Sequence, residues 1–292
     1  MKIIQYLING ISLGSVYAII ALGYTMVYGV LRLINFAHGE IFMIAMYIVF
    51  YGISMFSLPW YVTFIVTILV TALLGTLAER LAYRPLRNAP RISILISAIG
   101  VSYFLQNIAL YVTGGLTKTY PSIPFLQKTV TVLGAHTKMV TVITPFLTIG
   151  LVVLLLLLIN HTKIGMAMRA VSRDFETSEL MGIDINRVIA VTFVIGSFLA
   201  AVGSILFFSN YTGVNPMSGA MPGLKAFVAA VFGGIGSVPG AVVGAFVIGL
   251  CENLIKGAGW TTFSDAFTFV LLIIILMVKP TGIFGEKDIN KV

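Results

Sequence analysis

The sequence predicts an all-α, polytopic membrane protein with about eight transmembrane helices, including broken or re-entrant segments in each half. Hydrophobic types make up 59% of its 292 residues, and the mean hydropathy is +1.04. Charged residues make up only 10%, against about 25% in soluble domains. A soluble fold of this size cannot bury so much apolar surface, so the predicted surroundings are lipid. Apolar residues come in blocks rather than in alternation, which argues against a β-barrel.

A helix needs about 20 apolar residues to cross the hydrocarbon core of a membrane. The blocks that fit best are residues 5–29, 41–57, 60–79, 92–112, 139–159, 188–208 and 262–278. The first block is longer than the core of a signal peptide and has no clear cleavage site, so we expect an uncleaved span. Residues 222–255 are ambiguous, because the stretch GGIGSVPG divides them into a half-length and a nearly full-length apolar piece.

The distribution of basic residues predicts the orientation. The net charge is +8, but Lys and Arg cluster in short gaps between apolar blocks, which favours cytoplasmic loops over nucleic-acid binding. Loops 80–91 and 160–187 are both rich in arginine and are separated by two spans, so both are predicted to be cytoplasmic. Loop 113–138 then faces outward despite its three lysines. The C-terminal tail is predicted to be cytoplasmic, and residues 222–255 must enter the membrane and return to the same side. The side of the N-terminus stays open.

Two interruptions of the apolar pattern stand out, NFAHGE at 35–40 and FGGIGSVPG at 232–240. Irregular backbone deep in a membrane is tolerated only where it is buried in protein or lines a wet cavity. Paired interruptions in two halves of a chain indicate a transporter. Packing glycines in a plain helix bundle are the alternative. The residues predicted to form the second break are Gly233, Gly234, Gly236 and Ser237, and Gly234 and Gly236 are expected to permit positive φ or close approach.

The polar residues of NFAHGE admit two interpretations. Asn35 could cap a helix whose positive end favours Glu40, with His38 as a satisfied core histidine. Alternatively, Asn35, His38 and Glu40 line or gate a pathway, since ionisable groups inside a membrane usually mark function. We expect no metal site, because the other two histidines fall in loops on opposite sides. The single cysteine, Cys251, rules out an intrachain disulfide.

The long loop at 160–187 is predicted to contain an amphipathic helix. Ser172 is the expected N-cap and Gly182 the expected stop. The acidic residues placed in the first turn are Asp174 and Glu176, and the apolar face is assigned to Val171, Phe175, Leu180 and Met181. Such a helix could dock against a partner, or it could lie on the lipid surface without one.

Three stretches carry a resemblance to a known family. GISLGSVYAIIALGYTMVYGVLRLINFAHGEIFMIAMY, the loop GMAMRAVSRDFETSELMGI, and KAFVAAVFGGIGSVPGAVVGA occur in this order. Together they closely resemble the H-type permeases of branched-chain amino acid ABC importers, and the resemblance covers essentially the whole chain. It implies one transmembrane permease domain at 1–292 in the inner membrane, without enzymatic activity and without cofactors.

The resemblance also implies partners and residue roles. The partners would be a second, similar permease, two cytoplasmic ATPases, a periplasmic amino-acid-binding protein and the surrounding lipid. The two interruptions, NFAHGE and GGIGS, would lie beside the translocation path. The residues that would contact an ATPase are Arg169, Ala170, Asp174, Glu179 and Gly182.

Other functions remain in competition. Permeases for urea and short amides share much of the same pattern, so the sequence leaves the substrate open. An ion-coupled secondary carrier should hold acidic residues within its spans, whereas the acids here are few and mostly fall in predicted loops. An intramembrane enzyme lacks a suitable set of catalytic residues. The sequence also leaves open whether the second permease is another chain or another copy.

Overall fold

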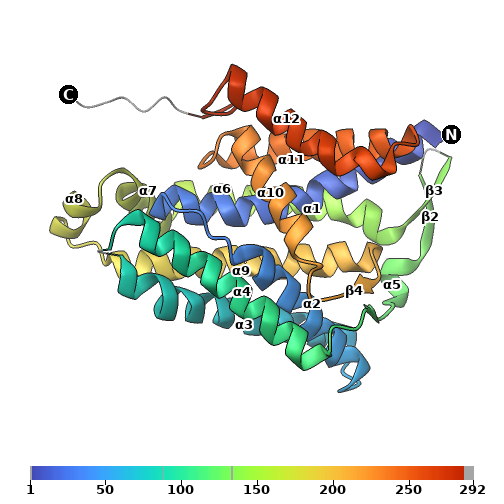
Figure 1. The fold of residues 1–292 in the computed structure, drawn as a ribbon, viewed down its shortest axis with the longest axis horizontal. Helices are drawn as coiled ribbons and strands as arrows, with labels where there is room; N and C mark the ends of the chain where they lie inside the picture. Colours follow the sequence, from blue (N-terminus) through green and yellow to red (C-terminus); the bar gives the residue numbers. More distant parts are fainter. Residues whose placement is uncertain (1, 88, 133, 286–292) are drawn as a thin grey trace.

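The computed structural model describes residues 2–87, 89–132 and 134–285 as a bundle of long helices (Figure 1). In this part of the chain, seven helices are long and apolar enough to cross a membrane, and two further apolar helices are shorter. The long ones are α1 (Lys2–Leu31), α3 (Trp60–Ala78), α4 (Arg91–Thr113), α6 (Met139–His161), α9 (Ile185–Asn210), α11 (Val238–Gly257) and α12 (Ser264–Val278), the last of which reaches 18 residues together with the 3₁₀ turn η3 (Thr261–Phe263) that precedes it. The short ones are α2 (His38–Ser54) and α10 (Ala220–Gly233). The predicted polytopic helical class is confirmed.

Helix α1 is the centre of the bundle. It is buried over most of its length after Ile11, and it contacts α6, α9, α10 and α11. Small residues permit the closest of these contacts, because a Cβ atom added at Gly14 would lie 2.9 Å from the backbone of Phe246 in α11. Helices α3, α4, α6 and α12 instead expose many large apolar side chains on the outside of the bundle, as lipid-facing helices do.

The connecting segments gather at two opposite ends (Figure 1). At one end, Arg32 donates to the carbonyl of Ser172 at 3.3 Å, and Arg87 donates to Asn186 at 2.5 Å. At the other, Gln5 donates to the carbonyl of His136 at 3.3 Å. Loops 80–91 and 160–187 therefore lie at one end of the bundle and loop 113–138 lies at the other. This arrangement agrees with the prediction that two spans separate the two arginine-rich loops.

Small β elements occur at the end that holds residues 113–138. The stretch TVTV forms β2 (Thr129–Val132), which pairs antiparallel with β3 (Ala135–Lys138). Strand β1 (Lys118–Thr119) pairs with β4 (Gly213–Val214), and α5 (Pro124–Gln127) is a single turn. The β1–β4 pair ties this loop to the segment that follows α9.

Two predicted boundaries need correction. The helix expected to end at 79 continues through a π-helical segment, η1 (Glu79–Tyr83), and a 3₁₀ turn, η2 (Arg84–Leu86). Tyr83 packs this segment against Phe193 of α9, whereas Leu81 is 75% exposed. The helix expected at 41–57 is α2, which begins at His38 and ends at Ser54. It ends earlier than predicted because Ser57, before Leu58 and Pro59, adopts a non-helical φ of 51°.

Candidate functional site

The NFAHGE stretch brings the start of α2 into the interior of the bundle. Segment 32–37 turns back from the end of α1 (Figure 1), and the ring of His38 packs edge-on against Tyr24 at a centroid distance of 4.6 Å. Tyr24 lies seven residues before the end of α1, which corresponds to about 10 Å along a helix. Helix α2 therefore starts well inside the bundle rather than at its surface.

Asn35 holds this break in place. Its side-chain oxygen accepts hydrogen bonds from the hydroxyl of Tyr83 at 2.6 Å and from the backbone N–H of Ala37 at 3.1 Å. The backbone N–H of His38 donates to the Asn35 carbonyl at 3.2 Å. Asn35 thus stabilises the turn before the helix, while Ala37 occupies the N-cap position without a side-chain cap.

His38 fills a space that glycine creates. Its side chain is 1% exposed, and a Cβ atom added at Gly23 would overlap the imidazole ring. Any larger residue at position 23 would push the ring out of place. Within the described ranges, no group of three or more His, Cys, Asp or Glu side chains could hold a metal ion. His38 therefore acts as a packing residue at the start of α2 in this structure.

Helix α10 starts beside α2. A Cβ atom added at Gly223 would lie 2.8 Å from the Cα of Gly39, and one added at Gly39 would lie 3.1 Å from the carbonyl oxygen of Gly219. The chain reaches α10 from β4, at the opposite end from the segment that leads into α2. Two short helices thus begin next to each other, and each start carries a positive partial charge.

A cavity of about 440 Å³ lies where these helix starts face α4, and we call it the Glu40 cavity. Glu40 is only 5% exposed, and one of its carboxylate oxygens has no hydrogen-bond partner among the described residues. The other lining residues are Tyr24, Phe36 and Gly39; Ile99, Ser102, Tyr103 and Gln106 of α4; and Ala220, Gly223, Leu224 and Phe227 of α10. The cavity therefore combines a buried carboxylate with polar and aromatic walls.

The Gly-rich stretch forms the tight turn between α10 and α11. Gly234 and Gly236 have φ values of 105° and 95°, which confirms the predicted backbone requirement. Ser237 caps α11 by accepting from the N–H of Gly240 at 3.2 Å. The N–H of Phe284 donates to the carbonyl of Gly233 at 2.9 Å. The turn thus packs against the segment after α12, whereas the start of α10 is what contacts NFAHGE.

Replacing Gly236 with valine should abolish transport while leaving membrane insertion largely intact. A β-branched residue at positive φ costs roughly 1–3 kcal/mol, and this turn sets the angle between α10 and α11. Uptake and membrane content of Gly236→Val should be measured beside Gly150→Val, because Gly150 lies in α6 with open space around it and no positive φ. Full activity of Gly236→Val would mean that the positive φ is dispensable.

The loop at 160–187 contains two helices rather than the single one predicted. They are α7 (Lys163–Arg173) and α8 (Phe175–Leu180). Asp174 separates them and caps α8 by accepting from the N–H of Thr177 at 3.1 Å. Ser172 is not the cap, because its hydroxyl donates to the carbonyl of Arg169 within α7. A carboxylate accepts from a helix start more effectively than a hydroxyl already committed within the preceding turn.

The other predicted features of this loop divide into two groups. Gly182 has a φ of 81° directly after α8, as expected for a helix stop. Val171 and Phe175 pack toward the core, whereas Leu180 and Met181 are 87% and 78% exposed. The single apolar face predicted for all four residues is therefore wrong, because the break at Asp174 turns the tip of the loop away from the bundle.

The remaining predicted contact residues lie along the same two helices. Arg169 donates to the side chain of Asn160 at 3.0 Å, and the carbonyl of Ala170 accepts from the N–H of Asp174 at 3.2 Å. Glu179 is exposed near the tip of α8. On the neighbouring segment, Arg87 forms an ion pair with the buried carboxylate of Glu79. Burial lowers the pKa of the Arg87 guanidinium, and the Glu79 charge opposes this shift.

A buried network of charges was missed by the sequence analysis. The ammonium of Lys225 in α10 donates to Glu252 of α11 at 2.9 Å and to Asp265 of α12 at 2.6 Å. Lys256 donates to Glu252 at 2.6 Å, and the Tyr17 hydroxyl donates to it at 3.0 Å. Isolated charges in the runs KAFVAAV and VIGLCEN were the available signal, but their pairing depends on how the helices meet.

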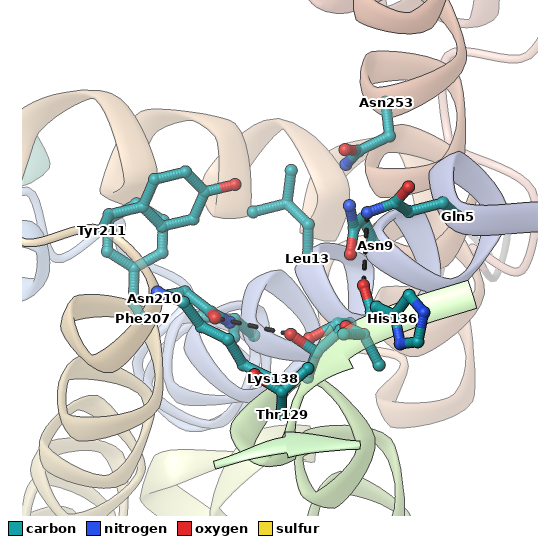
Figure 2. Close-up of a pocket in the computed structure, with 14 residues that line it drawn as sticks. Gln5, Asn9, Leu13, Thr129, His136, Lys138, Phe207, Asn210, Tyr211 and Asn253 are labelled. Carbon is teal, nitrogen blue, oxygen red and sulfur yellow. Dashed lines mark hydrogen bonds between the residues drawn. The ribbon is translucent and has the colours of Figure 1, made fainter. Parts of the chain in front are cut away.

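A second polar cavity, of about 400 Å³, lies at the end that holds the β2–β3 hairpin (Figure 2). Four amide side chains surround it, Gln5, Asn9, Asn210 and Asn253, which come from α1, α9 and α11. Figure 2 shows Gln5 donating to the backbone carbonyl of His136. The Thr141 hydroxyl donates to the side-chain oxygen of Asn210 at 3.4 Å. Polar groups therefore extend into the bundle from this end.

Comparisons with known proteins match this architecture to one family. A family model described as "Branched-chain amino acid transport system / permease component" matches residues 6–276. The permease LivH of Escherichia coli K12 is 42% identical over 300 residues, covering 99% of this chain and 97% of LivH. BraD of Pseudomonas aeruginosa is 40% identical, with coverage of 99% and 98%. Both relatives are described as high-affinity branched-chain amino acid transport system permease proteins.

A more distant relative and one solved structure are also similar to this chain. A probable LivH of Methanocaldococcus jannaschii is 27% identical and covers 91% of this chain and 88% of that protein. Among solved structures, PsaBC from Streptococcus pneumoniae in complex with Fab aligns at 15% identity with a TM-score of 0.43, over 96% of this chain and 91% of that chain. That structural similarity is too weak to support a conclusion. The family match and the two close relatives, each spanning nearly the whole chain, establish that this protein belongs to the family of branched-chain amino acid transport system permeases.

Proposed function

We propose that this chain is the permease subunit of an ATP-driven importer. It would carry branched-chain or other hydrophobic amino acids across the inner membrane after delivery by a periplasmic binding protein. The observation that carries the proposal is the similarity of nearly the whole chain to LivH and BraD. On this proposal residues 1–292 form one permease domain, which performs no covalent chemistry and needs no cofactor, while partner subunits hydrolyse ATP.

The start of α2 supplies the features that a translocation path needs. Asn35, His38 and Glu40 are buried polar residues at this helix start, and Glu40 lines the Glu40 cavity. The turn at Gly233, Gly234, Gly236 and Ser237 would transmit movement to α10, because it joins α10 to α11 and contacts the segment after α12. On this proposal both interrupted regions move when the path opens.

Helices α7 and α8 supply the coupling element. Arg169, Ala170, Asp174, Glu179 and Gly182 would position and contact an ATPase subunit at the exposed tip of the loop. Leu180 and Met181 are apolar side chains presented to solvent there, which suits insertion into a cleft of a partner protein. Residues 279–285 would lie on the same, cytoplasmic side, since the N–H groups of Ile283 and Phe284 donate to carbonyls at the end of α10. The rest of the predicted cytoplasmic tail lies outside the described residues.

Purification of the tagged chain in mild detergent tests the proposal. We expect two ATPase subunits and a second permease to co-purify, and the reconstituted complex should take up leucine only with ATP and the binding protein. Uptake of urea or a short amide in place of leucine would assign the chain to the alternative substrate class. Gradient-driven uptake by the chain alone would indicate a secondary carrier.

Cysteine labelling tests the sidedness. In a Cys251→Ala background, cysteines introduced at Ser122 and Ser172 should react with an impermeant thiol reagent from opposite sides of the membrane. Ser122 lies in loop 113–138, whereas Ser172 lies at the far end of the bundle in α7. Labelling of both positions from the same side would contradict the proposed topology.

A further inference from the structure

We infer that the Glu40 cavity is a transit site for the amino acid zwitterion, in which the Glu40 carboxylate binds the α-ammonium group. The inference rests on the proposed function and names the position that the substrate occupies on this subunit. It assigns the ammonium, the carboxylate and the side chain of the substrate to different parts of one cavity.

The first argument is the unpaired charge. Glu40 is 95% buried, as its exposure of 5% implies, yet one of its oxygens has no hydrogen-bond partner in the described part of the chain. The ion pairs formed by the described residues do not include Glu40. The Ser102 side chain is a hydrogen-bond partner of Glu40, but a buried carboxylate with one unsatisfied oxygen and no opposite charge beside it is still costly and needs a compensating donor. A ligand ammonium brings three N–H donors and the opposite charge.

The second argument is the polarity of the surrounding elements. Helices α2 and α10 contain 17 and 14 residues, and the first turn of each reaches the cavity. Helix starts favour negative groups, which suits both the Glu40 carboxylate and the carboxylate of a substrate. Ser102 and Gln106 of α4 also line the cavity and can donate hydrogen bonds. A zwitterion therefore finds partners for both of its charges.

The third argument is the apolar part of the cavity. Phe36 and Phe227 have ring centroids 6.4 Å apart, and Tyr24 lies 5.8 Å from Phe227. Leu224 extends this surface. The volume of about 440 Å³ falls within the range of roughly 300–1,000 Å³ that is usual for small-molecule sites. These walls suit an aliphatic side chain.

Two other cavities are less suitable for binding a zwitterion. A cavity of about 710 Å³ between α2, α3 and α4 is lined almost entirely by apolar side chains and has no group for a charge. The cavity beside Lys225 contains charges that already neutralise one another. The Glu40 cavity also reaches the surface of the described chain, because its lining residues Tyr103 and Leu224 are 62% and 41% exposed.

The first test measures uptake by the complete complex in proteoliposomes. Glu40→Gln keeps the shape of the side chain but removes its charge, so leucine uptake should fall roughly tenfold or more, because hydrogen bonds to charged groups typically contribute that much to binding. Leu224→Trp should block the cavity and lower uptake to a similar extent. Leu254→Trp is the matched control, since Leu254 is about equally exposed, at 44% against 41%, and lies on α11 away from this cavity.

The second test detects occupancy directly. In the Cys251→Ala complex, Ser102→Cys is treated with N-ethylmaleimide, and labelling of this chain's own peptide is followed by mass spectrometry. Leucine should slow labelling at least threefold. Two analogues should fail to slow labelling at the same concentration. They are 4-methylpentanoate, which lacks the ammonium, and 3-methylbutylamine, which lacks the carboxylate. Adding Glu40→Gln should remove the protection by leucine.

The outcomes separate this inference from the proposed function. Equal protection by 4-methylpentanoate, or normal uptake by Glu40→Gln, would show that Glu40 does not bind the ammonium. Absence of leucine protection in a complex that transports leucine would overturn the transit site and leave the proposed function intact. A complete complex with unaltered Glu40 that fails to transport leucine would contradict the proposed function itself. Co-purification of each variant with its partners reports whether it still folds.

Discussion

Replacing Glu252 with leucine should destabilise the folded protein by about 3–5 kcal/mol, the usual cost of removing one partner from a buried ion pair. Glu252 is 2% exposed and accepts hydrogen bonds from Lys225, Lys256 and Tyr17. Its loss would leave the ammonium of Lys225, whose side chain is 6% exposed, with Asp265 alone. The effect should appear as a lower thermal unfolding midpoint of the purified protein in mild detergent.

A double substitution shows whether the loss comes from the unpaired charge. Glu252→Leu combined with Lys225→Met removes both buried charges, so it should be less destabilising than the sum of the single changes. Lys256 and Asp265 then remain, and both have access to solvent. Glu176→Leu is the control, because Glu176 is an exposed acid on α8 and should change stability by less than about 0.5 kcal/mol. Additive effects of the two buried changes would contradict the ion-pair explanation.

Replacing Gly182 with proline should leave the permease in the membrane but remove the ATPases, and ATP-dependent uptake with them. The φ of 81° at Gly182 is incompatible with the proline ring, which fixes φ near −65°. Proline would also delete the N–H that donates to the Glu179 carbonyl at 2.9 Å. Both changes displace α8 and the exposed residues at its tip. Co-purification with the ATPases and uptake into proteoliposomes provide the measurements.

Gly182→Asn is the matched control for this prediction. Asparagine tolerates positive φ better than other side chains and keeps the backbone N–H, so this variant should retain its ATPases and most of its uptake. Normal assembly and transport by Gly182→Pro would show that the loop is a passive surface element. In that case the coupling contact must lie elsewhere on the same end of the bundle.

Local features of the chain were predictable because they depend on neighbouring residues. The requirement for positive φ at Gly234 and Gly236 follows from a run of small residues that divides an apolar block. The helix stop at Gly182 is equally local. The predicted break at NFAHGE is also observed, since α1 ends at Leu31 and α2 starts at His38. In each case the preference of the backbone or side chain does not depend on distant partners.

Prediction was weaker where the role of a residue depends on the direction of the helices around it. Ser172 and Asp174 are both plausible helix caps, but Ser172 bonds back into α7 and Asp174 caps α8. Leu180 and Met181 fit an apolar face by spacing, yet they are exposed because the chain changes direction at Asp174. Acidic residues were expected mostly in loops, whereas Glu40 and Glu252 lie buried in helices. Spacing alone does not report how a helix is oriented.

The sequence by itself determined the membrane class, the approximate spans, the two interruptions and the resemblance to a permease family. Hydropathy acts over about 20 consecutive residues, so transfer into lipid can be read from a linear window. Only the tertiary structure decided that α2 and α10 start side by side, and that Lys225 meets partners 27 and 40 residues away in the chain. Those contacts depend on how several helices pack around α1. Electrostatic attraction and close packing act through space, and a distance along the chain does not fix a distance between atoms.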